Sequence, residues 1–202
     1  LNASITGSNP LCNTGTAALT FTPATGYQTF TGGGSAIQWQ SSPDNGVTPF
    51  ANIATGATSV SYSNSSLSTP TYYRAIVKDG AGATCLTSDV RFVDVISPVF
   101  TSAPPVTRCG PGSVTMTVSA ASGDINWYSA LSGGSSIQTG TTYSTSVTAS
   151  TSFYATLTLT RSGTTCESSP RTAIPVTVTA SGTQLALTTG TQAAQTRDTI
   201  CN

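Results

Sequence analysis

The segment Ile125-Asn126-Trp127 decides how the chain is organised, because a matching segment, Ile37-Gln38-Trp39, occurs earlier in the sequence. Each segment lies in a set of four landmarks that keep one order. The earlier set, copy one, is Cys12, Ile37-Gln38-Trp39, Thr71-Tyr72-Tyr73 and Cys85. The later set, copy two, is Cys109, Ile125-Asn126-Trp127, Ser152-Phe153-Tyr154 and Cys166. The last tyrosine and the second cysteine are 12 residues apart in both sets, so we interpret the chain as a tandem repeat.

Each copy predicts short strands separated by turns, which is typical of an all-β sandwich. Apolar and polar residues alternate, so that Val114, Met116 and Val118 share one face of a predicted strand. We expect strands over residues 18–22, 36–40, 72–78 and 90–95 of copy one, and over 113–119, 124–128, 153–160 and 174–179 of copy two. Pro175 favours an edge position for the last of these strands, because proline cannot donate a ladder hydrogen bond.

The strand that carries the aromatic pair does not align cleanly between the copies. When Tyr73 is matched to Tyr154, the apolar alternation that begins at Phe153 coincides with the outward-looking residues Tyr72 and Arg74. Either a β-bulge interrupts one strand or the alignment is off by one residue.

Composition excludes several function classes. Only 7% of residues are charged, seven basic and seven acidic, and histidine is absent. Without a basic stripe, nucleic acid and anionic lipid are poor partners, and no apolar run reaches the ~20 residues that span a bilayer. The carboxylates are few and scattered, and the commonest general base is missing. We therefore expect neither an enzyme nor a cofactor.

The copies are separated by short joints near Ser97-Pro98 and Ser181-Gly182. The segment Thr199-Ile200-Cys201-Asn202 echoes Pro10-Leu11-Cys12-Asn13. We therefore expect one domain over residues 1–97, a second over 98–181, and the start of a third over 182–202. Both ends are interpreted as cuts within a longer protein.

Copy two carries the residues of a family resemblance: Cys109-Gly110-Pro111-Gly112-Ser113-Val114, Asn126-Trp127-Tyr128, Ser132-Gly133-Gly134, Gly140-Thr141-Thr142-Tyr143 and Phe153-Tyr154. They resemble the Ig-like repeats of large surface and secreted proteins of Bacteroidota that use the type IX secretion system. Copy one keeps the frame but has 34 residues from Trp39 to Tyr73, against 27 from Trp127 to Tyr154. The resemblance implies tandem Ig-like β-sandwiches at the cell surface or outside the cell, in stalks of adhesins that include the gliding adhesins.

Five cysteines in a Lys-poor chain indicate an oxidising compartment. No CxxC pair and no histidine support a metal site. Because the repeat order makes each copy self-contained, we expect one disulfide within each copy, Cys12–Cys85 and Cys109–Cys166. Cys201 is then half of a disulfide to a residue beyond the fragment.

Two groups of aromatic residues are candidate ligand platforms. Trp39 and Trp127 are predicted to pack in the core, since each lies two residues after an isoleucine on a strand. Tyr72 and Tyr154 are candidates for exposed rings that touch a glycan.

The remaining candidate sites are a turn and a modification site. A calcium site at Asp44-Asn45 lacks the spaced acidic ligands of known loops. Thr199 is a candidate O-glycosylation site, because Asp198-Thr199-Ile200 matches the sequon that the resemblance implies.

Two functions follow from these features. The first is a structural stalk or spacer of a large adhesin or filament, whose partners are the neighbouring repeats of the same polypeptide. Low charge also allows lateral self-association of such stalks. The alternative is an extracellular module that binds carbohydrate or protein, with a glycan or surface ligand as its partner.

Overall fold

The computed structural model describes residues 3–23, 36–54 and 57–180, and these residues contain strands and turns but no helix. They form two compact units: one contains the described residues among 1–97 together with 159–166, and the other contains residues 98–158 together with 167–180. The predicted all-β Ig-like fold is confirmed. The predicted start of a third copy, with Cys201 and Thr199, lies outside the described residues.

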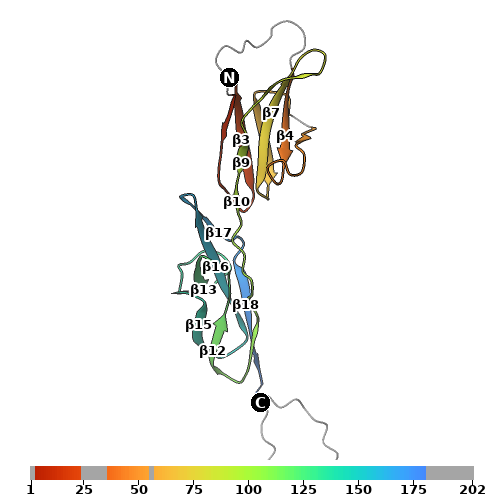
Figure 1. Ribbon diagram of the computed structural model, residues 1–202. Helices are drawn as coiled ribbons and strands as arrows, with labels where there is room; N and C mark the ends of the chain where they lie inside the picture. Colours follow the sequence, from red (N-terminus) through yellow and green to blue (C-terminus); the bar gives the residue numbers. More distant parts are fainter. Residues whose placement is uncertain (1–2, 24–35, 55–56, 181–202) are drawn as a thin grey trace, which may run out of the picture. The chain divides into compact units, whose positions relative to one another are not determined.

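The first unit packs a three-stranded sheet and a five-stranded sheet around one core (Figure 1). The smaller sheet has the order β1 (Ser4–Gly7), β3 (Gly15–Thr22), β6 (Ser61–Leu67). The larger has the order β5 (Ala51–Asn52), β4 (Ala36–Ser42), β7 (Thr71–Lys78), β8 (Thr84–Thr87), and β9 (Arg91–Val93) also pairs with β7. A parallel pair, β2 (Leu11–Cys12) with β10 (Val95–Ile96), completes the unit.

The second unit repeats this plan. Its larger sheet has the order β11 (Val106–Cys109), β18 (Thr172–Thr179), β16 (Thr151–Arg161), β13 (Asp124–Tyr128), β14 (Gln138–Thr139). In a second sheet of this unit, β12 (Gly112–Thr117) pairs with β15 (Thr142–Val147). The short strand β17 (Thr164–Glu167) pairs with β16, and residues 159–166 of the hairpin that they form belong to the first unit. Val114, Met116 and Val118 are all buried in the core of this unit, as their alternation predicts. The edge position predicted from Pro175 holds only locally, because β11 pairs in parallel with residues 176–179 of β18 on the side away from β16, and this pairing begins one residue after Pro175.

The tryptophans settle the alignment of the two copies. Trp39 is paired with Ala75, and Trp127 is paired with Ala155. Tyr73 therefore corresponds to Phe153 rather than to Tyr154, and the alignment was off by one residue. With this register the inward residues agree, since Ala75 and Val77 correspond to Ala155 and Leu157, and all four are buried.

The predicted disulfides Cys12–Cys85 and Cys109–Cys166 are both wrong. Cys12 is bonded to Cys166, with Cα atoms 5.3 Å apart, whereas Cys85 is a free, exposed thiol. Cys109 is also in a disulfide, but Cys166 is not its partner. In terms of the sequence, the observed bond joins the first cysteine of copy one to the second cysteine of copy two.

The strand registers explain why Cys12 and Cys85 do not pair. Val93 is opposite Thr71, at the start of β7. Ile96 follows three residues later, and Cys12 is paired with Ile96. Cys85 lies beside Val77 and Lys78 at the end of β7. About nine residue positions separate them along the sheet, which at ~3.3 Å per residue is roughly 30 Å. A disulfide needs Cα atoms within about 7 Å.

Candidate functional site

The strand that carries Cys12 is fixed to the last strand of copy one by main-chain hydrogen bonds. Leu11 N–H donates to the Asp94 carbonyl (2.9 Å) and Asn13 N–H donates to the Ile96 carbonyl (2.8 Å). Asp94 N–H donates to the Asn9 side-chain oxygen (2.7 Å). Because Cys12 lies within this ladder, its sulfur is held on an ordered backbone.

Cys166 lies on the return strand of the hairpin formed by β16 and β17, whose turn has positive φ at Ser162 (50°) and Gly163 (79°). The hydroxyls of Thr160 and Thr165 hydrogen-bond across the two strands (2.9 Å). The tip of this hairpin, residues 159–166, belongs to the first compact unit. In the disulfide with Cys12, Cys166 is only 1% exposed.

An ion pair accompanies the disulfide within this unit. Arg161 Nη1 donates to both carboxylate oxygens of Asp94, each at 3.2 Å. The Asp94 side chain is 12% exposed but that of Arg161 is 56% exposed, and pairs open to water contribute only ~0–1 kcal/mol. The disulfide is therefore the stronger of these two links between the hairpin tip and residues 1–97.

Cys85 stands on the corresponding hairpin of copy one. The turn before it is ordered by Asp79, whose carboxylate accepts hydrogen bonds from Ala81 N–H (3.0 Å) and Ala83 N–H (2.8 Å). The thiol is exposed, and its hydrogen bond is long, from Sγ to the Ala83 carbonyl oxygen (3.7 Å). It is the one free cysteine among the residues that the structure describes.

Neither tryptophan is open to a ligand, because both are 0% exposed. The Trp39 indole N–H donates to the Ser59 carbonyl and that of Trp127 donates to the Gly140 carbonyl, both at 2.8 Å. Each indole ring is the first of three aromatic rings in contact, Trp39–Tyr62–Tyr73 in one cluster and Trp127–Tyr143–Phe153 in the other. The centroids of successive rings are 5.3–5.8 Å apart. These polar and ring contacts are those of a buried aromatic in a core.

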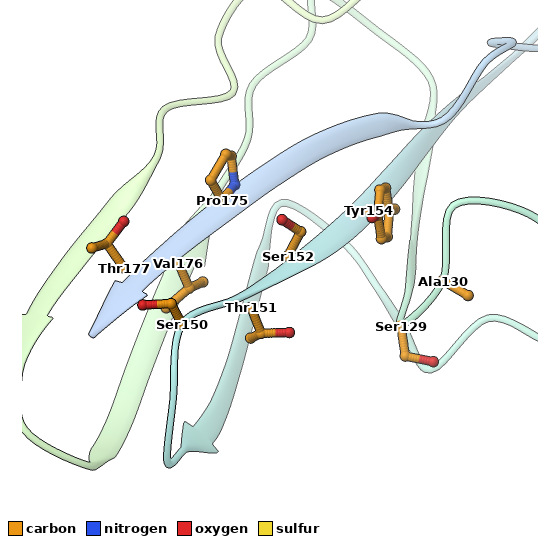
Figure 2. A pocket seen from close by; sticks show the side chains of 9 residues that line it. All are labelled: Ser129, Ala130, Ser150, Thr151, Ser152, Tyr154, Pro175, Val176 and Thr177. Carbon is orange, nitrogen blue, oxygen red and sulfur yellow. The ribbon is translucent and has the colours of Figure 1, made fainter. Parts of the chain in front are cut away.

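The two candidate glycan-contacting tyrosines have different surroundings. The Tyr72 ring packs against Phe92, with centroids 4.6 Å apart. Tyr154 is half-buried and lines a shallow depression of about 560 Å³ in the second unit. Figure 2 shows Tyr154 and Ser152 on the strand beside the one that carries Pro175. Most of the remaining lining is Ser and Thr: Ser129, Ser150, Thr151 and Thr177.

The depression is uncharged but is flanked by an ordered cation. Tyr128 is paired with Tyr154 across β13 and β16. The Arg171 guanidinium lies 3.4 Å from the centroid of the Tyr128 ring and donates to the Ala130 (2.8 Å) and Gly133 (2.7 Å) carbonyls. Hydroxyls beside one aromatic ring are groups that can contact a neutral polar ligand such as a sugar. The described residues contain no cluster of His, Cys, Asp and Glu that could hold a metal.

Asp44 uses its carboxylate within its own turn. Thr48 donates to it twice, from the hydroxyl (2.7 Å) and from the main-chain N–H (2.7 Å), and the Ser42 hydroxyl donates a third hydrogen bond (3.0 Å). These hydrogen bonds lower the pKa of Asp44 below its ordinary value of 3.8, and the bond from the Thr48 hydroxyl has the largest effect. They give the carboxylate a structural role that needs no calcium ion.

We expect Thr48→Val to raise the pKa of Asp44, because the strongest hydrogen bond to its ionised form is lost. A carboxyl whose pKa is lowered by folding stabilises the fold above its unfolded pKa and loses that contribution as the pH falls. Carbon-detected NMR titration of Asp44 measures the shift, with Thr84→Val as a control in an exposed strand. An unchanged Asp44 pKa would contradict this account of the turn.

Comparisons with known proteins cover both copies. Residues 1–97 match the family described as "Domain of unknown function (DUF8696)", and residues 96–179 match "Ig-like domain CHU_C associated". No curated protein matches the chain in sequence. No helix among the described residues is long and apolar enough to cross a membrane.

Two solved structures are similar at low identity. The teleost fish polymeric Ig receptor (pIgR) ectodomain has a TM-score of 0.38 and 10% identity, covering 90% of this chain and 100% of that one. The chicken CNTN1 FN1-FN3 domains have a TM-score of 0.35 and 14% identity, covering 88% of this chain and 66% of that one. The chain is an all-β protein of Ig-like fold, and its residues 96–179 are similar to a Bacteroidota-associated Ig-like family.

Proposed function

We propose that this chain is a structural stalk or spacer segment of a large, secreted cell-surface adhesin or filament built from Ig-like repeats. The observation that carries the proposal is the Cys12–Cys166 disulfide, which joins the first cysteine of one copy to the second cysteine of the next. A bond of this kind resists separation of successive parts of a polypeptide. A segment that carries tension between the two ends of a molecule requires this resistance to separation.

Burial of the chemically distinctive side chains supports the same role. Both tryptophans are enclosed, and the Asp44 carboxylate is used within its turn. The exposed faces of the strands are rich in hydroxyls, as in the Thr115–Ser144 pair (2.8 Å). Such faces stay hydrated with few charges, which also leaves little repulsion against lateral self-association.

The proposed organisation follows the sequence repeats. Residues 1–97 and 98–181 form two Ig-like domains, and residues 182–202 begin a third. The disulfide and the similarity of residues 96–179 to a Bacteroidota-associated family support export through the type IX system to the cell surface. Mobile gliding adhesins are one class of protein that would use such a stalk.

A binding module is the second candidate, and the depression beside Tyr154 favours it. A glycan would place one sugar face on the Tyr154 ring and its hydroxyls against Ser152 and Thr177. Glycan-array binding by the chain that is lost in Tyr154→Ala but kept in Tyr72→Ala would support this candidate.

Small-angle scattering on polypeptides of two, four and six copies tests the spacer. We expect a maximum dimension that grows almost linearly with copy number. Matched polypeptides with serine at every position equivalent to Cys166 should show a smaller increment per copy, because the joining bond is absent. A compact or freely jointed array with intact disulfides would contradict the spacer role.

A further inference from the structure

We propose that Cys85 is the attachment point for a disulfide to the first cysteine of another Ig-like copy, a bond of the same kind as Cys12–Cys166. The inference deepens the proposed spacer function, since it names a bond that would join copy one to a further copy. It rests on three observations about the cysteines and their strands.

The first observation is that the two cysteines of a copy lie at opposite ends of its sheet. Cys12 and Cys85 are about nine residue positions apart along β7, roughly 30 Å. In copy two, Val176 is opposite Thr151, at the start of β16. Thr179 follows three residues later, and Cys109 is paired with Thr179. Cys166 follows the other end of β16. A second cysteine therefore needs a partner from outside its own copy.

The second observation is that Cys85 and Cys166 lie on corresponding strands, β8 and β17, each of which follows the central strand of its copy and pairs with it. Their places along these strands are close but not identical. Ser88 accepts a hydrogen bond from Ala75 N–H (2.9 Å), whereas Ser168 accepts one from Leu157 N–H (3.0 Å), and Leu157 corresponds to Val77 rather than to Ala75. Cys85 lies in a β-bulge opposite Val77 and Lys78.

The third observation is the state of the two thiols. Cys166, with its partner in place, is 1% exposed, whereas Cys85 is free and exposed on a hairpin whose turn Asp79 has already ordered. The corresponding strand of copy two thus shows what a second cysteine can bind: a cysteine of the Leu11-Cys12-Asn13 type, presented from a short parallel strand.

Formation of the bond is a two-electron oxidation by a disulfide oxidant, such as oxidised glutathione or a thiol–disulfide oxidoreductase. The Cys85 thiolate attacks the oxidant's disulfide and releases one thiol. The first-cysteine thiolate of the other copy then attacks the mixed disulfide at the Cys85 sulfur and releases the second thiol. Two protein thiols and one oxidant disulfide give one protein disulfide and two small thiols.

The other copy can belong to the same polypeptide or to a second molecule, and peptide mapping of the secreted parent protein distinguishes the two. Free thiols are alkylated before non-reducing digestion. We expect the Cys85 peptide to be disulfide-linked to the first cysteine of another copy. Migration as a single chain in a denaturing, non-reducing gel assigns the bond to one polypeptide, and a ladder that collapses on reduction assigns it to neighbours. Alkylated Cys85, a glutathione adduct or a Cys85–Cys85 bond would overturn the proposal.

A reconstitution with this chain tests the same bond in isolation. The donor is a ¹⁵N-labelled Cys85→Ser, Cys166→Ser double variant, in which Cys12 has lost its partner, and the acceptor is the wild-type chain. In a glutathione redox buffer we expect a covalent heterodimer that contains a Cys85–labelled Cys12 peptide. The matched acceptor variant Cys85→Ser should give at least tenfold less covalent heterodimer. Equal yields from the two acceptors would contradict the proposal, and because no scattering is involved, either result is separate from the test of the spacer.

Discussion

Replacing Cys12 and Cys166 together with serine should lower the free energy of unfolding by about 2–5 kcal/mol. The disulfide spans 154 residues of sequence, and in the chain-entropy model a loop of that length constrains the unfolded chain by about 5 kcal/mol, an upper figure. Calorimetry or urea unfolding measures the loss. The size is large for a domain whose total stability is on the order of 5–15 kcal/mol.

Cys85→Ser is the matched control for this variant. Its thiol is exposed and free, so we expect a change within about 0.5 kcal/mol. Reduction of the wild-type chain also opens the disulfide of Cys109, so it should lower the free energy of unfolding at least as much as the double variant does. A double variant as stable as the wild type, or a Cys85→Ser variant as unstable as the double variant, would contradict the observed pairing.

Trp127→Ala should destabilise the second unit by about 3–5 kcal/mol, because it leaves a large cavity in a closed core. The side chain is 0% exposed and its N–H donates to the Gly140 carbonyl. Trp127→Phe keeps most of the packing and leaves that carbonyl without its donor, so a smaller loss of about 1–3 kcal/mol is expected. Thermal unfolding followed by near-UV circular dichroism ranks the variants.

Leu131→Ala is the control in the same unit, since Leu131 is 55% exposed. It should change the stability by no more than about 0.5 kcal/mol. If Trp127→Ala kept wild-type stability but lost binding to a glycan, the ring would be a ligand platform rather than part of the core.

The sequence predicts strands well where apolar residues alternate. A strand is present at each of the eight expected places, and 124–128 agrees with β13 at both ends. The sequence does not predict strands β6 and β15, because both consist largely of Ser, Thr and Asn. Each contains a single aromatic residue, Tyr62 in β6 and Tyr143 in β15. Such strands present almost no period-two signal.

Long-range pairing is the part that the sequence does not contain. The order Cys, Trp, Tyr, Cys suggested a bond within each copy, but only the register of β9 and β10 shows that Cys12 and Cys85 are at opposite ends. Pro175 indicates an edge only at its own position, since the parallel pairing of β11 with β18 begins at Val176 and joins segments far apart in the chain. The shallow depression beside Tyr154 likewise combines residues from three separate segments.

The pairing of Cys12 is the central claim, and non-reducing peptide mapping of the oxidised chain tests it most directly. After alkylation at low pH and digestion, tandem mass spectrometry identifies the peptide linked to Cys12. The structure predicts a link to the peptide that contains Cys166, with Cys85 alkylated as a free thiol. A Cys12–Cys85 link would show that each copy closes on itself, and it would contradict the account of copies joined in succession.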